Sequence, residues 1–175
     1  MAKKIREIQT LSKESRVLYD VVNNESDLPC VLITTSFLDQ CLASILERFF
    51  INGNTAESVL DPLRGCLGSF AARADLCYCL GLIPKGLFRN LRTVGEIRNR
   101  FAHSYLSLTF DDPEVAHLCE SLLFPKVTPE SIKDPWAKFK HPREKFTMCV
   151  VIMANRLMLT GLSTKRRPKE EKGWD

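Results

Sequence analysis

The sequence predicts an all-α fold, a single-domain bundle of five to six helices. Two patterns carry this prediction. Apolar residues recur at spacings of three and four along most of the 175-residue chain, which places them on one side of a helix. The alternation of apolar and polar residues that is typical of a strand is nowhere sustained, and no Asn-Gly or Asp-Gly turn separates two strand-like runs. We therefore expect helices that pack around a common core.

Two helices open the chain, and a polar break at residues 23–26 separates them. The first is expected over residues 5–23. Asp27 suits the N-cap of the second helix, and Pro29 suits its first turn, where a missing N–H costs little. The second helix, over residues 29–50, is apolar over a wide arc, so we expect it to be the central helix of the core.

Three further helices are expected in the middle of the chain. A short one around residues 59–63 precedes a turn bracketed by two glycines. Ser69 is a candidate N-cap for a helix over residues 70–80, and Gly81 ends this helix because glycine readily adopts the left-handed conformation. The next helix, over about residues 85–103, carries the candidate site.

The last third of the chain holds two helices and a long connection. Asp112 and Pro113 start a helix over residues 113–123. The segment 124–141 contains three prolines and is expected to be irregular. A final helix over residues 142–162 again shows apolar residues at helical spacing.

Composition favours one globular domain over residues 1–163, with its core at about 27–123 plus the final helix, and a charged flexible tail at 164–175. Hydrophobic residues make up 45% of the chain and charged residues 26%. The net charge of +4 is compatible with nucleic acid without being diagnostic, and much of the excess lies in the tail. No apolar run of membrane-spanning length and no signal peptide are recognised, so we expect a cytoplasmic protein with no membrane partner.

The seven cysteines are odd in number, and none form a C-x-x-C pair. Most lie among apolar residues, which predicts reduced, buried thiols. No histidines or cysteines complement them at the spacing of a zinc site, and the chain has no phosphate-binding loop and no serine nucleophile elbow. We expect no cofactor and no metal. No recognition helix of a DNA-binding module stands out, so sequence-specific DNA binding is poorly supported.

The chemistry-bearing stretch is RTVGEIRNRFAHSY, residues 92–105. RNA cleavage without a metal needs a group that takes the proton from the ribose 2′-OH, and His103 can do so near neutral pH. It also needs positive charge on the phosphate, which Arg98 can supply through its fork of donors, while Asn99 can orient either group. The alternative is structural: His103 caps the end of its helix, and Arg98 pairs with a surface acid.

Two neighbouring residues have similar pairs of interpretations. Glu96 shares a helix face with His103 and could orient it, or it could belong to an Arg92–Glu96–Arg100 ladder of ion pairs, which we prefer. Arg73 could add a second phosphate contact, or it could form an intramolecular salt bridge, with Asp75 nearby.

The segment Arg98-Asn99-Arg100-Phe101-Ala102-His103 resembles the R-x(4–6)-H signature of HEPN domains, including the Asn that often follows the Arg. With Tyr105 it also resembles the R-x4-H-x-Y form of HEPN toxins that are paired with nucleotidyltransferase antitoxins. This resemblance implies an all-α, commonly dimeric, metal-independent endoribonuclease. It implies that Arg98 and His103 are catalytic, that Asn99 supports them, and that Tyr105 matches the tyrosine such antitoxins modify.

A second resemblance covers residues 30–123, which are similar to the MltR (mannitol operon repressor) family of small helical regulators. It is carried by the segment LGSFAARADLCYCLGLI at residues 67–83 and by Asp61-Pro62-Leu63 upstream. Where the family typically has Asp, this chain has Ser69. MltR proteins look like HEPN relatives in which the catalytic motif is often degraded, whereas here it is intact.

Two functions follow. The first is a HEPN-like endoribonuclease of MltR-like architecture, a toxin or defence effector that acts on RNA and forms a homodimer. The second is a non-enzymatic MltR-type transcriptional regulator that acts through contacts with a protein partner, an antitoxin or a regulatory protein. Arg98 and His103 are five residues apart, about 140° around a helix. A catalytic role therefore requires that the helix ends or bends near Ala102, that the length of the Arg98 side chain closes the gap, or that a second subunit supplies the complementary residue.

Overall fold

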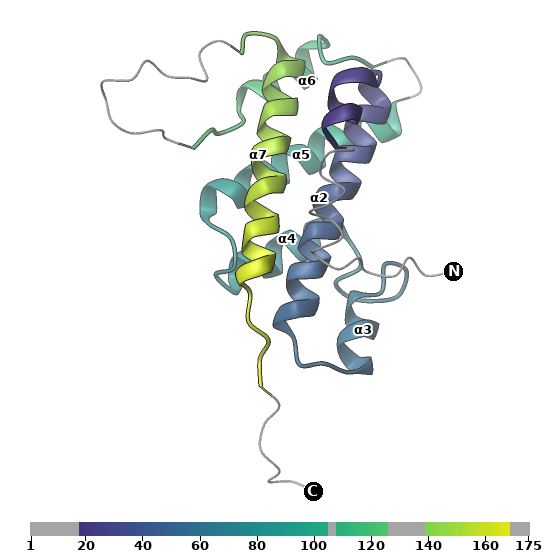
Figure 1. Cartoon of the computed structure of the whole chain (residues 1–175). Coiled ribbons are helices and arrows are strands. Elements are labelled where there is room, and N and C mark those ends of the chain that lie inside the picture. The colour runs from purple at the N-terminus through teal and green to yellow at the C-terminus, as the bar shows by residue number, and fades with distance from the viewer. Residues whose placement is uncertain (1–17, 105–107, 126–138, 169–175) are drawn as a thin grey trace, which may run out of the picture.

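The computed structural model describes residues 18–104, 108–125 and 139–168. Every regular element in these ranges is a helix, which confirms the predicted all-α class. Residues 18–24 are helical and precede α2 (Figure 1). The other helices are α2 (Asp27–Phe49), α3 (Asn54–Leu60), α4 (Phe70–Cys79), α5 (Lys85–His103), α6 (Pro113–Glu120) and α7 (Pro142–Ser163).

Helices α2 and α7 lie side by side and run in the same direction (Figure 1). At their starts, Arg143 of α7 forms an ion pair with Asp27 of α2. At their ends, the backbone N–H of Arg167 donates to the carbonyl oxygen of Phe49 at 2.9 Å, and the Arg167 guanidinium lies 5.0 Å from the centre of the Phe49 ring. The first residues of the predicted tail therefore lie against the end of α2.

Helix α5 runs in the opposite direction to these two. Phe101, near its end, packs on Phe110, which in turn packs on Phe146 near the start of α7, with ring centres 5.5 and 5.0 Å apart. Fully buried aliphatic side chains fill the space between α2, α5 and α7, each contributing roughly 1.5–3 kcal/mol. They include Leu38, Leu42, Ile45, Leu91, Val94, Ile97, Val150 and Leu157.

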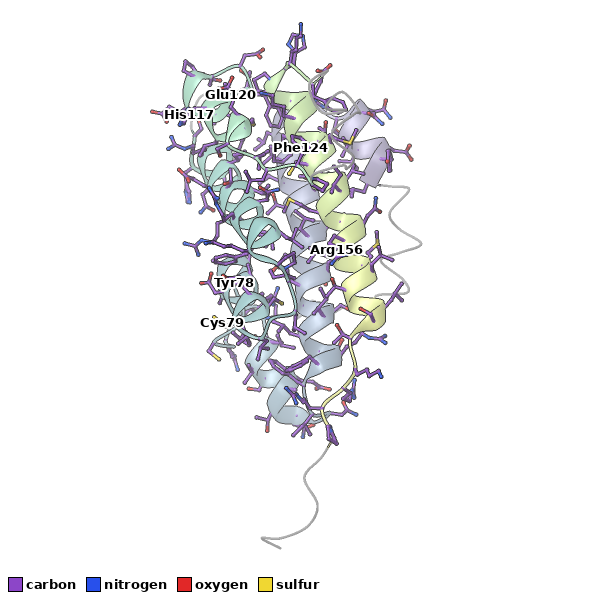
Figure 2. The ribbon with its side chains drawn as sticks, turned by 90° about the vertical axis from the view of Figure 1, so that its left-hand side faces the viewer. Tyr78, Cys79, His117, Glu120, Phe124 and Arg156 are labelled. Carbon is purple, nitrogen blue, oxygen red and sulfur yellow. The ribbon has the colours of Figure 1, made fainter. Side chains whose placement is uncertain are left out.

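Helix α4 packs antiparallel against α5. Tyr78 at its end stacks on Phe88 near the start of α5, with ring centres 4.5 Å apart. Phe70 at its start lies on Gly95, where a Cβ atom would come within 3.3 Å of the Phe70 ring. Glycine at this position thus allows the two helices to approach closely. Figure 2 shows Tyr78 on the same side of the molecule as His117 of α6, which lies toward the other end.

Two helices, α2 and α7, are long and apolar enough to span a membrane, by length and composition alone. The sequence has no uninterrupted apolar run of this length, so no such helix is predicted from it. Each helix contains a few polar residues, but its average hydropathy of 1.5 is still high. In the bundle, 56% of the apolar window of α2 and 50% of that of α7 is buried. This is the pattern of central helices in a globular core.

Helix α3 lies earlier than predicted, at Asn54–Leu60 instead of around 59–63. It ends there because Asp61 precedes Pro62, and the residue before a proline is disfavoured in helical conformation. The Asp61 carboxylate accepts the backbone N–H groups of Leu63 and Arg64 at 2.9 and 2.8 Å. These two hydrogen bonds fix the turn after α3 and lower the pKa of Asp61.

Helix α6 ends at Glu120, earlier than the predicted residue 123. The buried side chain of Asn90 on α5 explains the difference. Its amide nitrogen donates to the carbonyl oxygen of Leu123 at 2.7 Å, and its amide oxygen accepts the Leu123 N–H at 2.9 Å. The chain leaves the helix to make these bonds. Of the predicted first helix, over 5–23, only residues from 18 onward are described, and the extent of the domain stays a prediction.

Candidate functional site

Helix α5 carries Arg98, Asn99 and His103, and all three side chains are exposed. Arg98 Nη1 donates a hydrogen bond to Asn99 Oδ1 at 3.0 Å. His103 is the last residue of α5, and the backbone N–H of Ser104 donates to the carbonyl oxygen of Arg100 at 3.0 Å to close the final turn. The helix therefore ends at the motif histidine, as the sequence predicts.

Arg98 and His103 nevertheless start from different sides of α5. The helix is continuous over Lys85–His103, so the two residues are about 140° apart around it and ~7.5 Å apart along it. The Arg98 guanidinium is bonded to Asn99, which lies one turn before His103.

Two other arginines of α5 are engaged with carboxylates. Arg100 pairs with Glu96 at 3.3 Å and also with Glu114 of α6. Arg92 pairs with Asp75 of α4 at 3.4 Å. The Glu96–Arg100 step of the preferred ladder is present, so Glu96 binds Arg100 rather than orienting His103. Arg92 does not belong to the ladder, because α4 brings Asp75 close to it.

Arg73 is buried, with only 2% of its side chain exposed. Nη1 donates to Asp39 of α2 at 2.7 Å, Nε to the Leu67 carbonyl at 2.8 Å, and Nη2 to the Leu60 carbonyl at 3.0 Å. The guanidinium fork thus ties the turn between α3 and α4 to α2. This corrects the suggested phosphate contact, because the side chain is buried and its donors are engaged. The intramolecular salt bridge is present, with Asp39 as partner in place of Asp75.

A groove with a volume of about 880 Å³ lies beside the motif, between α2, the start of α4 and α5. Arg98 and Asn99 line it together with Arg92 and Glu96, and Ser36 and Asp39 of α2 form part of the opposite wall. His103 is not part of its described lining. Sequence reasoning missed this groove, because its α2 residues look like an ordinary polar face and only the packing of three helices creates the concavity.

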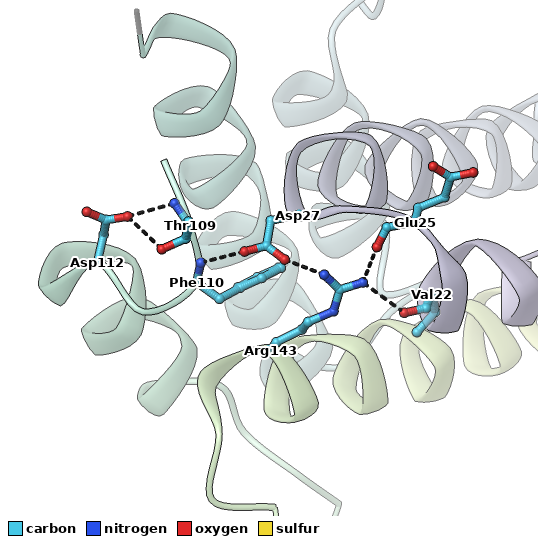
Figure 3. Close-up of polar contacts among 7 residues, drawn as sticks. All are labelled: Val22, Glu25, Asp27, Thr109, Phe110, Asp112 and Arg143. Atoms are coloured by element: carbon cyan, nitrogen blue, oxygen red, sulfur yellow. Dashed lines mark hydrogen bonds and ion pairs between the residues drawn. The ribbon is translucent and has the colours of Figure 1, made fainter. Parts of the chain in front are cut away.

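The chain beyond His103 is held by a polar cluster that the sequence did not suggest (Figure 3). Asp27 accepts the backbone N–H of Phe110 at 3.0 Å and also binds Arg143. Arg143 in turn donates to the carbonyl oxygens of Val22 and Glu25. This cluster joins the starts of α2 and α7 to the segment that returns from α5, and a smaller cavity of about 400 Å³ lies next to it.

The sequence also suggests a role for Tyr105 in modification and predicts no metal site. Tyr105 lies outside the described residues, so its predicted role in modification stays a prediction. Within the described part of the chain, no group of three or more His, Cys, Asp or Glu side chains is arranged to hold a metal ion.

Comparison with protein families and with curated proteins gave no match. Among solved structures, a chain of the MtlR–HPr complex from Escherichia coli is similar to this one, with 17% sequence identity and a TM-score of 0.65. The alignment covers 84% of this chain and 99% of that chain. This chain therefore has an MtlR-like fold, as the MltR resemblance predicts. At this identity the likeness concerns the fold alone and does not extend to the Arg98–His103 motif.

Proposed function

We propose that this protein is a HEPN-like, metal-independent endoribonuclease on an MtlR-like fold, a cytoplasmic effector of the toxin or defence type. One observation supports this most directly. Arg92 and Arg100 of α5 pair with carboxylates, whereas Arg98 makes no ion pair with any residue that the structure describes and is bonded to Asn99. An exposed cation that an amide orients is ready to bind a phosphate.

In the proposed reaction, His103 takes the proton of the ribose 2′-OH as that oxygen attacks the adjacent phosphorus. The bond from phosphorus to the 5′-oxygen breaks, and the departing oxygen takes up a proton, leaving a 2′,3′-cyclic phosphate and a 5′-hydroxyl. Arg98 stabilises the negative charge that develops on the phosphorane oxygens. Asn99 holds the Arg98 guanidinium in place.

A homodimer forms part of this proposal. One helix surface leaves Arg98 and His103 apart and open to solvent, so a second copy supplies the complementary residue and excludes water from the site. The departing 5′-oxygen then receives its proton from the second His103. A composite site of this kind explains how exposed motif residues on one continuous helix can act on one phosphate.

The test is cleavage of RNA in the presence of EDTA, followed by analysis of the new ends. The wild-type protein should produce 2′,3′-cyclic phosphate ends, and His103→Ala should lower the rate by roughly 10²–10⁴-fold because the general base is lost. His117→Ala is the matched control, since His117 is an exposed histidine on α6 outside the motif. Unchanged cleavage in His103→Ala, or no cleavage of any RNA, would contradict the proposal.

A second candidate is a non-enzymatic regulator that acts through protein contacts. The similar solved chain comes from a complex of MtlR with HPr, which favours a protein partner for this fold. This function predicts a stable complex in a calorimetric titration with purified HPr, no RNA cleavage, and unchanged binding in His103→Ala. The two candidates therefore differ in the effect of one substitution.

A further inference from the structure

We propose that the groove between α2, α4 and α5 holds the RNA strand next to the cleaved phosphate, with Arg92 as a second phosphate contact. The inference rests on the proposed nuclease function and adds a binding path to it. Arg98 lines the groove, and the α5 wall extends back to Leu91. This wall is ~12 Å long, enough for a few nucleotides on the side of Arg98 away from His103.

The charges of the groove favour an anion. Its lining includes two carboxylates, Asp39 and Glu96, and two guanidinium groups, Arg92 and Arg98. Each carboxylate is neutralised by an arginine outside the described lining: Asp39 by Arg73 at 2.7 Å and Glu96 by Arg100 at 3.3 Å. Of the four lining charges, Arg98 is therefore the one without an ion pair to any residue that the structure describes, while Arg92 pairs with Asp75 outside the lining at 3.4 Å.

Arg92 is free to exchange its partner. Its ion pair with Asp75 is long, at 3.4 Å, and the two side chains are 55% and 50% exposed. Exposed ion pairs with this geometry contribute little to the stability of the fold. A phosphate can therefore replace the Asp75 carboxylate with little loss of stability. Arg98 and Arg92 would then bind successive parts of the same sugar–phosphate backbone.

The groove also offers apolar surface for bases. Leu32 of α2 and Phe70 at the start of α4 line it, and both are half-buried. The Phe70 ring packs against Gly95 of α5. An aromatic ring beside two cations is the combination that binds single strands with little sequence preference.

The experiment measures binding of a short, labelled, mixed-sequence oligoribonucleotide to His103→Ala protein, which should not cut it. In this background Arg92→Ala should weaken binding about tenfold and reduce the slope of log K against log salt by about 0.7. Arg89→Ala is the control, because Arg89 is also exposed on α5 and lies outside the groove lining. Ser36→Trp, on the opposite wall, should block the groove and weaken binding without loss of charge.

The outcomes separate this inference from the proposed function. In the cleaving protein, Arg92→Ala should raise KM and leave kcat unchanged. If RNA is cut but Arg92→Ala and Arg89→Ala have equal effects, the strand lies elsewhere and only the groove assignment is wrong. If RNA is neither bound nor cut, both ideas fail. If an oligoglutamate peptide binds in place of RNA and is lost in Arg92→Ala, the groove binds acidic protein segments.

Discussion

Two arginines on adjoining helices, Arg73 of α4 and Arg98 of α5, carry the same charge in opposite surroundings. Arg73 is buried and donates to Asp39 and to two backbone carbonyls. Arg98 is exposed and bonded to its neighbour Asn99. A buried charge is tolerated when its donors are satisfied, so Arg73 serves the fold. An exposed charge without a carboxylate partner contributes little to the fold, so Arg98 is available to a ligand.

The largest expected effect comes from removing the buried charge. Arg73→Met should lower the free energy of unfolding by about 3–5 kcal/mol, because Asp39 loses its ion pair with Arg73 and two backbone carbonyls lose their donors. Arg98→Met should change it by less than about 0.5 kcal/mol, as exposed substitutions usually do. Equilibrium unfolding in urea measures both.

A double variant sharpens the same comparison. Asp39→Leu combined with Arg73→Met should recover part of the lost stability, since both charges of this ion pair are then absent. Equal losses in Arg73→Met and Arg98→Met would show that burial does not distinguish the two arginines.

The cysteines show the same difference between buried and exposed side chains. Cys77 is buried while Cys79, two residues later on α4, is exposed, as is Cys66; the other four are buried. Burial raises the pKa of Cys77 to about 12 and that of Cys30 to about 11. Thiol labelling of the folded protein should therefore modify Cys66 and Cys79 first, and full labelling should require denaturant. Fast labelling of all seven thiols would contradict the described core.

The pH dependence follows from the same burial. The folded chain keeps protons on its buried thiols that the unfolded chain loses above about pH 9. The contribution of these thiols to the free energy of unfolding is therefore complete below pH 9 and is lost as the pH rises from about 9 to 12. Each such thiol should account for up to about 1.4 kcal/mol per pH unit. Urea midpoints at pH 8 and pH 10 check the sign.

A capping residue at the start of α4, four positions before Arg73, should affect stability less than Arg73 does. Ser69 Oγ accepts the Ala72 N–H at 3.2 Å as an N-cap, so Ser69→Ala should lower the free energy of unfolding by about 1 kcal/mol. RNA cleavage should not change, because the Arg98–Asn99 pair is untouched. Ser69 also lines the groove, so a loss of cleavage larger than the loss of folded protein would show that its hydroxyl contacts the RNA strand.

Local patterns predicted much of the fold. The apolar spacing in α2, α4, α5 and α7 and the Ser69 cap depend on residues within a few positions of one another. Gly81, which follows α4, has a φ of 69°, the conformation expected of a helix-ending glycine. Boundaries such as the end of α6 could not be predicted, because Asn90 reaches Leu123 from 33 positions away.

The sequence by itself determined the helices, the motif on α5 and its end at His103, since a helix and its caps are set by near neighbours. Only the tertiary structure decided which charges are engaged. Arg73 meets Asp39 across 34 positions and Arg143 meets Asp27 across 116, and no periodicity encodes such pairs. The groove beside Arg98 has the same origin, because three separately encoded helices must dock before their polar edges enclose a space.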